Sequence, residues 1–289
     1  MGHVVSIHPL TPRDFVEYKI HSSAIIHPDA NLGNNVSVGP FSIVGSGVQV
    51  GDNTEIGPGV LIEAGTVIGK DCKMGHGASI GGMPQILNFK SVPSSVHIGD
   101  GTTLREYVTI HRSGKENGVT RIGRNCLLMA YAHVAHDCEV GDHAILVNNV
   151  GLSGHVVVEE HAFVSGITGV HQFVRIGKHA MVGGGMIVRQ NILPFSLVGG
   201  PPPRLVGINA VGLRRRGFPP AVRGAIRKAI KVILQPDLNT SQALEKIQRE
   251  FEMIDEIRYL IDFIKNSPRG ITKHKSIDRD EKEENDESH

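Results

Sequence analysis

Aliphatic residues recur at every sixth position over most of the chain. Stepping by six from Ile20 meets Ile, Leu, Val or Met at each step as far as Ile80, and the same register returns after each of two interruptions and continues to Val188. The following residue is often Gly, and the fifth position of the repeat is small or β-branched. A period of six matches neither a helix nor a simple strand alternation. It predicts short strands joined by tight turns, repeated many times.

Three such units make one triangular coil, and stacked coils form a parallel β-helix whose aliphatic side chains fill the prism. We place this domain at residues 20–193, after an N-terminal extension of residues 1–19. The interruptions at 86–97 and 113–121 are polar and rich in turn residues. Segments of this kind should loop outward from a regular prism.

The pattern changes after Pro194. Residues 194–218 form a connector with a Gly-Gly-Pro-Pro-Pro stretch, which marks a boundary. Apolar residues then recur every three or four positions, so we expect a small α-helical domain at 219–270, with one helix starting near Asn239. Residues 271–289 are charged, and we expect a disordered tail. The predicted fold class is mainly β: a parallel β-helix of hexapeptide repeats with a small C-terminal α-helical domain.

Composition limits where the protein acts and what it binds. The 289 residues include three Cys, too few for a disulfide framework and all at the small inward position, so we expect core packing and a cytoplasmic protein. No apolar run approaches the length of a membrane span.

The totals of 30 basic and 29 acidic residues nearly cancel, yet no acidic residue lies between Glu160 and Asp237, where eleven are basic. This cationic segment predicts an anionic partner, and its lack of interleaved aromatic residues argues against nucleic acid.

Two groups stand out among the sixteen histidines. One group avoids the inward positions of the repeat and should face outward or toward a neighbouring subunit: His133, His136, His155 and His171. A second group is spaced by one coil and should stack about 5 Å apart as a surface ladder: His143, His161 and His179.

Four blocks of the chain carry a specific resemblance: HVAHDCEVGDHAILVNN, GLSGHVVV, GVHQFVRIG and INAVGLRRRGF. They resemble the UDP-N-acetylglucosamine O-acyltransferases of lipid A synthesis, and the resemblance extends from about Ile20 to the Pro-Arg-Gly at 268–270. It implies a left-handed β-helix and a homotrimer with active sites between the prisms, without cofactor or metal. It also implies transfer of a (3-hydroxy)acyl chain from acyl carrier protein to the 3-position of UDP-N-acetylglucosamine.

The resemblance also assigns roles. His136 would be the general base, since an imidazole suits proton removal from a hydroxyl at neutral pH, and the Gly154 N–H would stabilise the thioester oxyanion. Asp137 would orient His136, which requires a turn, because adjacent strand residues point apart. Gly184, which matches the position that limits acyl length, leaves room for a longer chain. The remaining implied contacts, to sugar, thioester and nucleotide, are Gln85, His133, His155, His171, Gln172, Asn209, Arg215 and Arg216.

Other functions stay open. Asn88 stands where the family often has Lys, and Val211 where it has Glu, so a 3-amino sugar acceptor is possible. A related N-acyltransferase is a further alternative, although that family usually has a globular domain ahead of its β-helix and we expect none here. A zinc carbonic anhydrase-like protein would draw its ligands from His133, His136, His155 and His171. A non-catalytic trimeric scaffold would use the fold alone.

Overall fold

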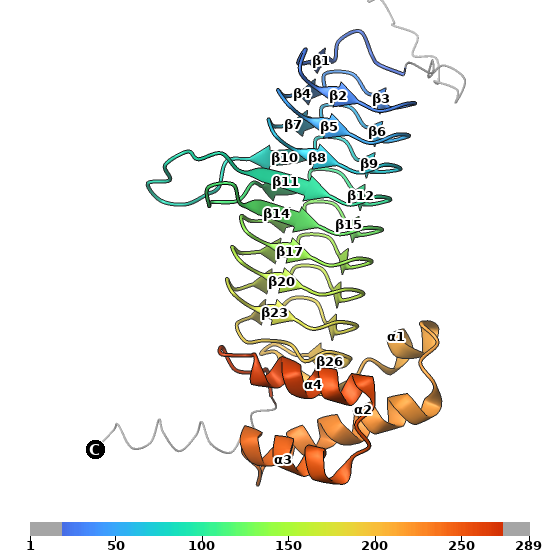
Figure 1. The fold of residues 1–289 in the computed structure, drawn as a ribbon, viewed down its shortest axis with the longest axis vertical. Coiled ribbons are helices and arrows are strands. Elements are labelled where there is room, and N and C mark those ends of the chain that lie inside the picture. Colours follow the sequence, from blue (N-terminus) through green and yellow to red (C-terminus); the bar gives the residue numbers. More distant parts are fainter. Residues whose placement is uncertain (1–18, 274–289) are drawn as a thin grey trace, which may run out of the picture.

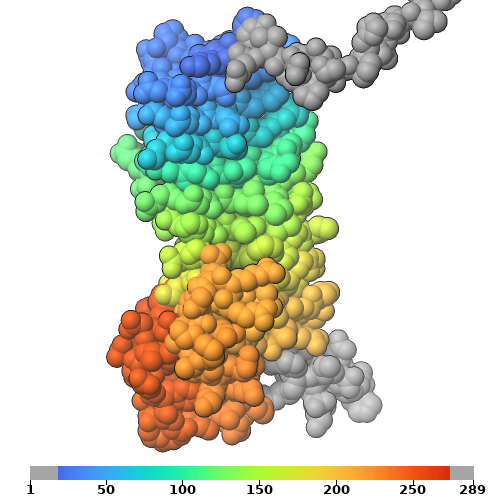
Figure 2. Space-filling view, turned by 90° about the vertical axis from the view of Figure 1, so that its right-hand side faces the viewer, coloured from blue at the N-terminus to red at the C-terminus, as the bar shows by residue number. Residues whose placement is uncertain are grey.

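A computed structural model describes residues 19–273 (Figure 1). All but the last residue of the expected N-terminal extension, and most of the expected charged tail, lie outside the described residues. The described chain winds into a column of short strands with helices at one end, and Figure 2 shows the helical domain closing that end of the column. The predicted fold class, a mainly β, left-handed parallel β-helix with a small helical C-terminal domain, is confirmed.

Three sheets form the faces of the prism. Sheet A contains β3 (Ser37–Val38), β6 (Glu55–Ile56), β9 (Lys73–Met74), β12 (Thr103–Leu104), β15 (Leu127–Leu128), β18 (Ile145–Leu146), β21 (Phe163–Val164), β24 (Met181–Val182), β26 (Ser196–Gly199) and β27 (Arg204–Ile208). Sheet B contains β1 (Ile25–Ile26), β4 (Ile43–Val44), β7 (Leu61–Ile62), β10 (Ser79–Gly82), β13 (Thr109–His111), β16 (His133–Val134), β19 (Gly151–Leu152), β22 (Gly169–Val170) and β25 (Ile187–Val188). Sheet C contains β2 (Asn31–Leu32), β5 (Gln49–Val50), β8 (Val67–Ile68), β11 (Ser95–Ile98), β14 (Val119–Ile122), β17 (Glu139–Val140), β20 (Val157–Val158) and β23 (Arg175–Ile176).

The chain turns from sheet to sheet at three edges, which we call AB, BC and CA after the sheets that they join. Partners in neighbouring coils are usually 18 residues apart, but they are 30 apart across the first insertion and 24 apart across the second. The insertions are loops 83–94 and 112–118, and both leave the prism at the BC edge, on the same side of the column (Figure 1). They begin directly after β10 and β13, earlier than the interruptions in the aliphatic period. They also end earlier, because β11 and β14 each begin before the aliphatic residue at which that period resumes.

The inward positions fill the prism as predicted. The aliphatic residues of the repeat are buried along nearly its whole length. Cys72, Cys126 and Cys138 are buried free thiols, and burial raises the pKa of all three. Their assignment to core packing is therefore confirmed.

The C-terminal part differs from the expectation at one boundary. Sheet A continues past residue 193, because β26 pairs with β24 in parallel and β27 returns antiparallel. The connector then forms α1 (Ala210–Arg215), which the apolar pattern did not predict.

Three helices follow within the expected helical domain: α2 (Pro220–Ile233), α3 (Thr240–Glu250) and α4 (Asp255–Lys265). Asn239 caps α3 through a reciprocal bond pair with Gln242, which confirms the predicted helix start. Among the described residues, none of the helices is both long and apolar enough to cross a membrane.

Candidate active site

The BC edge carries the first of the two histidine groups that the sequence singled out. Asp137, His155 and Phe173 occupy the same turn position in successive coils, each with a positive φ of 60 to 64°. The sequence analysis required a turn at Asp137 for its side chain to reach His136. The left-handed backbone of Asp137 provides that turn, because a residue in this region does not follow the alternation of a strand. The His136 and Asp137 side chains therefore meet, with 2.7 Å between His136 Nδ1 and Asp137 Oδ2.

Asp137 is surrounded by hydrogen-bond donors. The Ser113 hydroxyl donates to its Oδ1, and the Gly114 N–H donates to its Oδ2 at 3.2 Å. The Asp137 N–H donates in turn to Thr120 Oγ1 at 2.9 Å. Burial of the Asp137 carboxyl disfavours its charge, but the hydrogen bonds from Ser113, His136 and Gly114 outweigh that cost and hold its pKa below the usual range. Asp137 is therefore an anion at neutral pH.

The other face of the His136 ring meets Gly154. A Cβ added to Gly154 would lie 2.5 Å from His136 Cε1 and 2.6 Å from Nε2. A side chain at this position would have to displace the His136 ring, so the backbone of residue 154 lies directly beside the Nε2 side of the imidazole. The His155 ring stands perpendicular to His136 with 5.2 Å between centroids, and it stacks on Phe173 at 4.6 Å.

A second pair of imidazoles joins the coil of His136 to the preceding coil. His133 Nδ1 is 2.7 Å from Thr109 Oγ1, and the His133 ring meets His111 edge-on at 4.8 Å. Burial, reinforced by His133 and His136, lowers the pKa of His111 to about 4, and burial also lowers the pKa of His133. Thr109, His111 and Ser113 were not found from the sequence. Thr109 pairs with His133 in the neighbouring coil, and this pairing was the one feature that could have identified it. The second insertion hides the pairing, because it lengthens the sequence separation between the two coils.

Three further predicted residues lie at the same edge. His171 and Gln172 are exposed on the coil after His155, and His171 Nδ1 is 3.2 Å from Nη2 of Arg269, which follows the last helix. Gln85 is exposed in loop 83–94, and its neighbour Ile86 reaches Gly114, where a Cβ would lie 2.7 Å from Ile86 Cδ1.

The remaining predicted residues lie at other edges. Asn209 caps α1 and donates from Nδ2 to the His179 carbonyl at 3.0 Å, at the CA edge. Arg215 and Arg216 are exposed at the end of the same helix. Gly184 is exposed in a turn of the AB edge. A single chain therefore does not bring these four residues to His136.

The second histidine group forms the expected column along the CA edge. The rings of His143 and His161 stack at 4.6 Å, and those of His161 and His179 at 4.9 Å. The column is not wholly a surface feature, because His179 is only 8% exposed and packs against Phe195 and Phe218.

Metal binding was considered for the His136, Asp137 and His155 cluster. One ligand atom from each of the three lies within 4.8 Å of the others. The 2.7 Å between His136 Nδ1 and Asp137 Oδ2 is a hydrogen-bond length. Two ligands of a tetrahedral zinc, each about 2.0 Å from the metal, lie farther apart than that. The distance between His136 and Asp137 thus fits a hydrogen-bonded pair. The cluster also differs from the zinc ligands considered from the sequence, which were four histidines and no aspartate.

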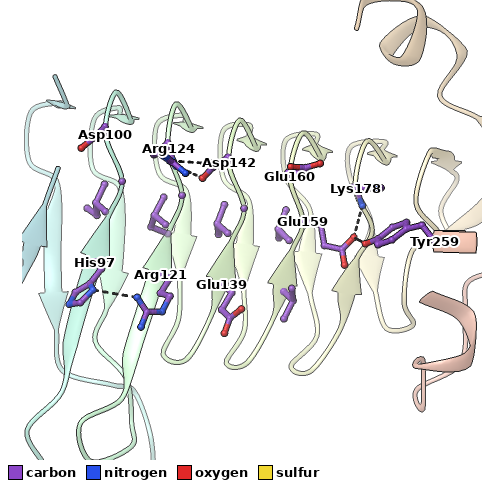
Figure 3. A pocket seen from close by; sticks show the side chains of 18 residues that line it. His97, Asp100, Arg121, Arg124, Glu139, Asp142, Glu159, Glu160, Lys178 and Tyr259 are labelled. Carbon is purple, nitrogen blue, oxygen red and sulfur yellow. Dashed lines mark hydrogen bonds and ion pairs between the residues drawn. The ribbon is translucent and has the colours of Figure 1, made fainter. Parts of the chain in front are cut away.

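A shallow hollow of about 710 Å³ lies elsewhere, on sheet C (Figure 3). Charged side chains such as Arg121, Glu139 and Glu159 line it, and none of the predicted site residues does. Glu159 accepts hydrogen bonds from the Lys178 N–H at 2.7 Å and from the Tyr259 hydroxyl of α4. This wall of the hollow is therefore a joint between the prism and the helical domain.

Known proteins match both parts of the chain. A family model described as UDP-N-acetylglucosamine O-acyltransferase, domain 2, matches residues 191–272, and the bacterial transferase hexapeptide model matches 29–64, 47–82 and 120–154. The acyl-[acyl-carrier-protein]–UDP-N-acetylglucosamine O-acyltransferase of Thermodesulfovibrio yellowstonii is 41% identical over 88% of this chain and 99% of its own length. That of Halorhodospira halophila is 40% identical with the same coverage.

Solved structures agree with these relatives. The UDP-N-acetylglucosamine acyltransferase of Francisella novicida superposes with a TM-score of 0.85 at 38% identity, covering 88% of this chain and 94% of that one. The enzyme of Bacteroides fragilis gives a TM-score of 0.85 at 39% identity, covering 88% and 99%. On the strength of these matches along both the prism and the helical domain, the chain belongs to the UDP-N-acetylglucosamine O-acyltransferase family.

Proposed function

We propose that the chain transfers an acyl or 3-hydroxyacyl group from acyl carrier protein to the 3-hydroxyl of UDP-N-acetylglucosamine, the first step of lipid A biosynthesis, in the cytoplasm. The observation that carries the proposal is the His136–Asp137 pair beside Gly154. An anionic Asp137 accepts a hydrogen bond from Nδ1, which leaves Nε2 of the neutral ring free to take a proton.

The reaction follows from this tautomer. Nε2 of His136 removes the proton of the sugar hydroxyl as its oxygen attacks the thioester carbonyl. The Gly154 N–H stabilises the resulting oxyanion. The C–S bond then breaks, and the thiol of the carrier leaves with the proton that His136 returns. Asp137 stabilises the imidazolium between these steps, as a carboxylate does in hydrolase triads.

Binding of the nucleotide requires a second copy of the chain. The AB edge exposes Phe41 (75%), Tyr107, Tyr131 and Ile167 (73%) in one line along the prism. We infer a homotrimer in which this edge faces the threefold axis, so that sheet A of one protomer packs on sheet B of the next. The BC edge of one protomer then faces the CA edge of its neighbour.

This arrangement would unite the separated residues. His136 of one protomer would face Asn209, Arg215 and Arg216 of the next, whose guanidinium groups suit the diphosphate of a nucleotide sugar. His133, His155, His171, Gln172 and Gln85 would line the same cleft from the BC edge. Gly184, exposed at the AB edge, would leave space for a long acyl chain between the prisms.

The decisive experiment is acyl transfer from 3-hydroxymyristoyl-acyl carrier protein to UDP-N-acetylglucosamine, with wild type beside His136→Ala. Loss of the general base should lower kcat by about 10²- to 10⁴-fold. If wild type shows no turnover, shorter acyl donors and the 3-amino sugar nucleotide are tried in the same assay. Failure of every pair by a folded protein would overturn the proposal, and equal activity of both proteins would remove His136 from the mechanism.

A further inference from the structure

Ser113 is fully buried although it lies in an inserted loop. It stands in loop 112–118 and has no solvent exposure. Its hydroxyl donates to Asp137 Oδ1 and accepts a hydrogen bond from the Lys115 N–H at 3.0 Å. The loop closes tightly around this hydroxyl, because a Cβ on Gly118 would collide with Ser113 Oγ. The insertion is folded so that one hydroxyl points at one carboxylate.

Ser113 also joins the two insertions. Its carbonyl accepts a hydrogen bond from the Ser94 hydroxyl at 2.6 Å, at the end of loop 83–94. The next residue, Gly114, donates to Asp137 Oδ2 and lies against Ile86 of the first loop. Both loops therefore meet the catalytic pair through the backbone or side chain of Ser113 and its neighbour.

The two oxygens of Asp137 have separate partners. Oδ1 is held by Ser113, while Oδ2 accepts from His136 at 2.7 Å and from Gly114. His155 Nε2 lies 3.7 Å from the same Oδ2 and can compete for it. A carboxylate that lost its Oδ1 partner could rotate, and its Oδ2 would no longer be directed at His136.

We propose that Ser113 is a positioning residue for the reaction: it fixes the rotation of the Asp137 carboxylate, so that Oδ2 holds the productive tautomer of His136. This inference rests on the proposed function. Ser113 touches neither substrate nor thioester in the mechanism above and acts only through Asp137. A hydrogen bond to a buried anion is among the stronger ones in proteins, so its removal should be measurable.

The test is Ser113→Ala in the full-length protein. We expect kcat to fall about 10- to 100-fold, as for a lost hydrogen bond to a charged group, and KM for the sugar nucleotide to change less than about threefold. In ¹³C-Asp-labelled protein, the pKa of the Asp137 carboxyl should rise, because its strongest stabilising partner is gone. Ser91→Ala is the matched control, since Ser91 accepts an inter-loop hydrogen bond from Arg112 at 3.0 Å without touching Asp137.

A double-mutant cycle separates positioning from loop stability. If Ser113 acts through Asp137, Ser113→Ala should add nothing to Asp137→Ala. Additive losses, an unchanged Asp137 titration, or an equal loss in Ser91→Ala would overturn the proposal. The carboxyl titration needs no turnover, so failure of the acyl-transfer assay leaves this test intact and the two failures distinguishable.

Discussion

A methyl group on Gly154 has no room beside the base. Because its Cβ would lie 2.5 Å from His136 Cε1, Gly154→Ala must rotate the imidazole away from Asp137 or from the substrate. We expect kcat to fall by about 10²-fold, as for a loss of general-base alignment. Gly224→Ala, in α2, is the control, because its Cβ would meet open space. Retained activity of Gly154→Ala, measured by acyl transfer, would contradict the close packing of this residue on the base.

At the scale of single residues, the sequence revealed the His136–Asp137 pair and missed the hydroxyl groups that hydrogen-bond to Asp137 and to His133. The repeat marked His136 as one of the outward histidines, and the family resemblance assigned roles to His136 and Asp137. The turn that this pairing requires at Asp137 is present, with a φ of 60°. Ser113 and Thr109 were not found, because insertions change the residue separation between coils from 18 to 30 and 24. A partner in the next coil is then no longer a fixed distance away in sequence.

Along the CA edge, the burial of one stacked histidine should make the stability of the fold depend on pH. His179 is buried among His161, Phe195 and Phe218. Burial, followed by the charges of its neighbours His161, Arg216 and Lys178, lowers its pKa to about 4.

In the unfolded chain, the His179 imidazole takes up a proton near pH 6.5, whereas in the folded protein it does so only near pH 4. The folded state is therefore fully stable above pH 6.5 and loses stability as the pH falls toward 4. The loss in the free energy of unfolding is at most about 3 kcal/mol. In His179→Phe, which keeps an aromatic ring in the stack, the free energy of unfolding should fall less steeply over this range. Denaturant melts at several pH values measure the slope. Parallel curves for the two proteins would exclude His179 as the source.

The strands were predicted well because each obeys the same six-residue rule, and both the core and the histidine column follow from it. The end of the prism was not predicted from the sequence, because β26 lies beyond the last regular repeat and β27 reverses direction after the prolines at 201–203. The short α1 carries one buried residue, Leu213, so it leaves no apolar period to detect. Its position depends on Asn209 and His179, which are 30 residues apart in the chain.

Considered whole, the prism separates two sets of functional residues onto different edges. His136 and its partners lie at the BC edge, and the cationic end of α1 lies at the CA edge. Packing around a threefold axis along the exposed apolar AB edge would bring these edges together between neighbours. The proposed site is thus complete only in the assembly, which also explains why the hollow on sheet C, an outward face in that arrangement, contains none of its residues.

Mixed trimers test this arrangement directly. His136→Ala removes the base from the BC edge, and Arg216→Ala removes a guanidinium from the CA edge, so each protein alone should be nearly inactive. In trimers formed by co-expressing the two chains equally, a site is intact when an Arg216→Ala protomer supplies His136 and an adjacent His136→Ala protomer supplies Arg216. Random assembly makes about a quarter of the sites native, so acyl transfer should recover to about that fraction of wild type. Separately purified trimers, mixed without exchange, should show no recovery. If co-expression restores nothing, the base and the arginine must act from the same chain, and the trimeric cleft proposed here would be wrong.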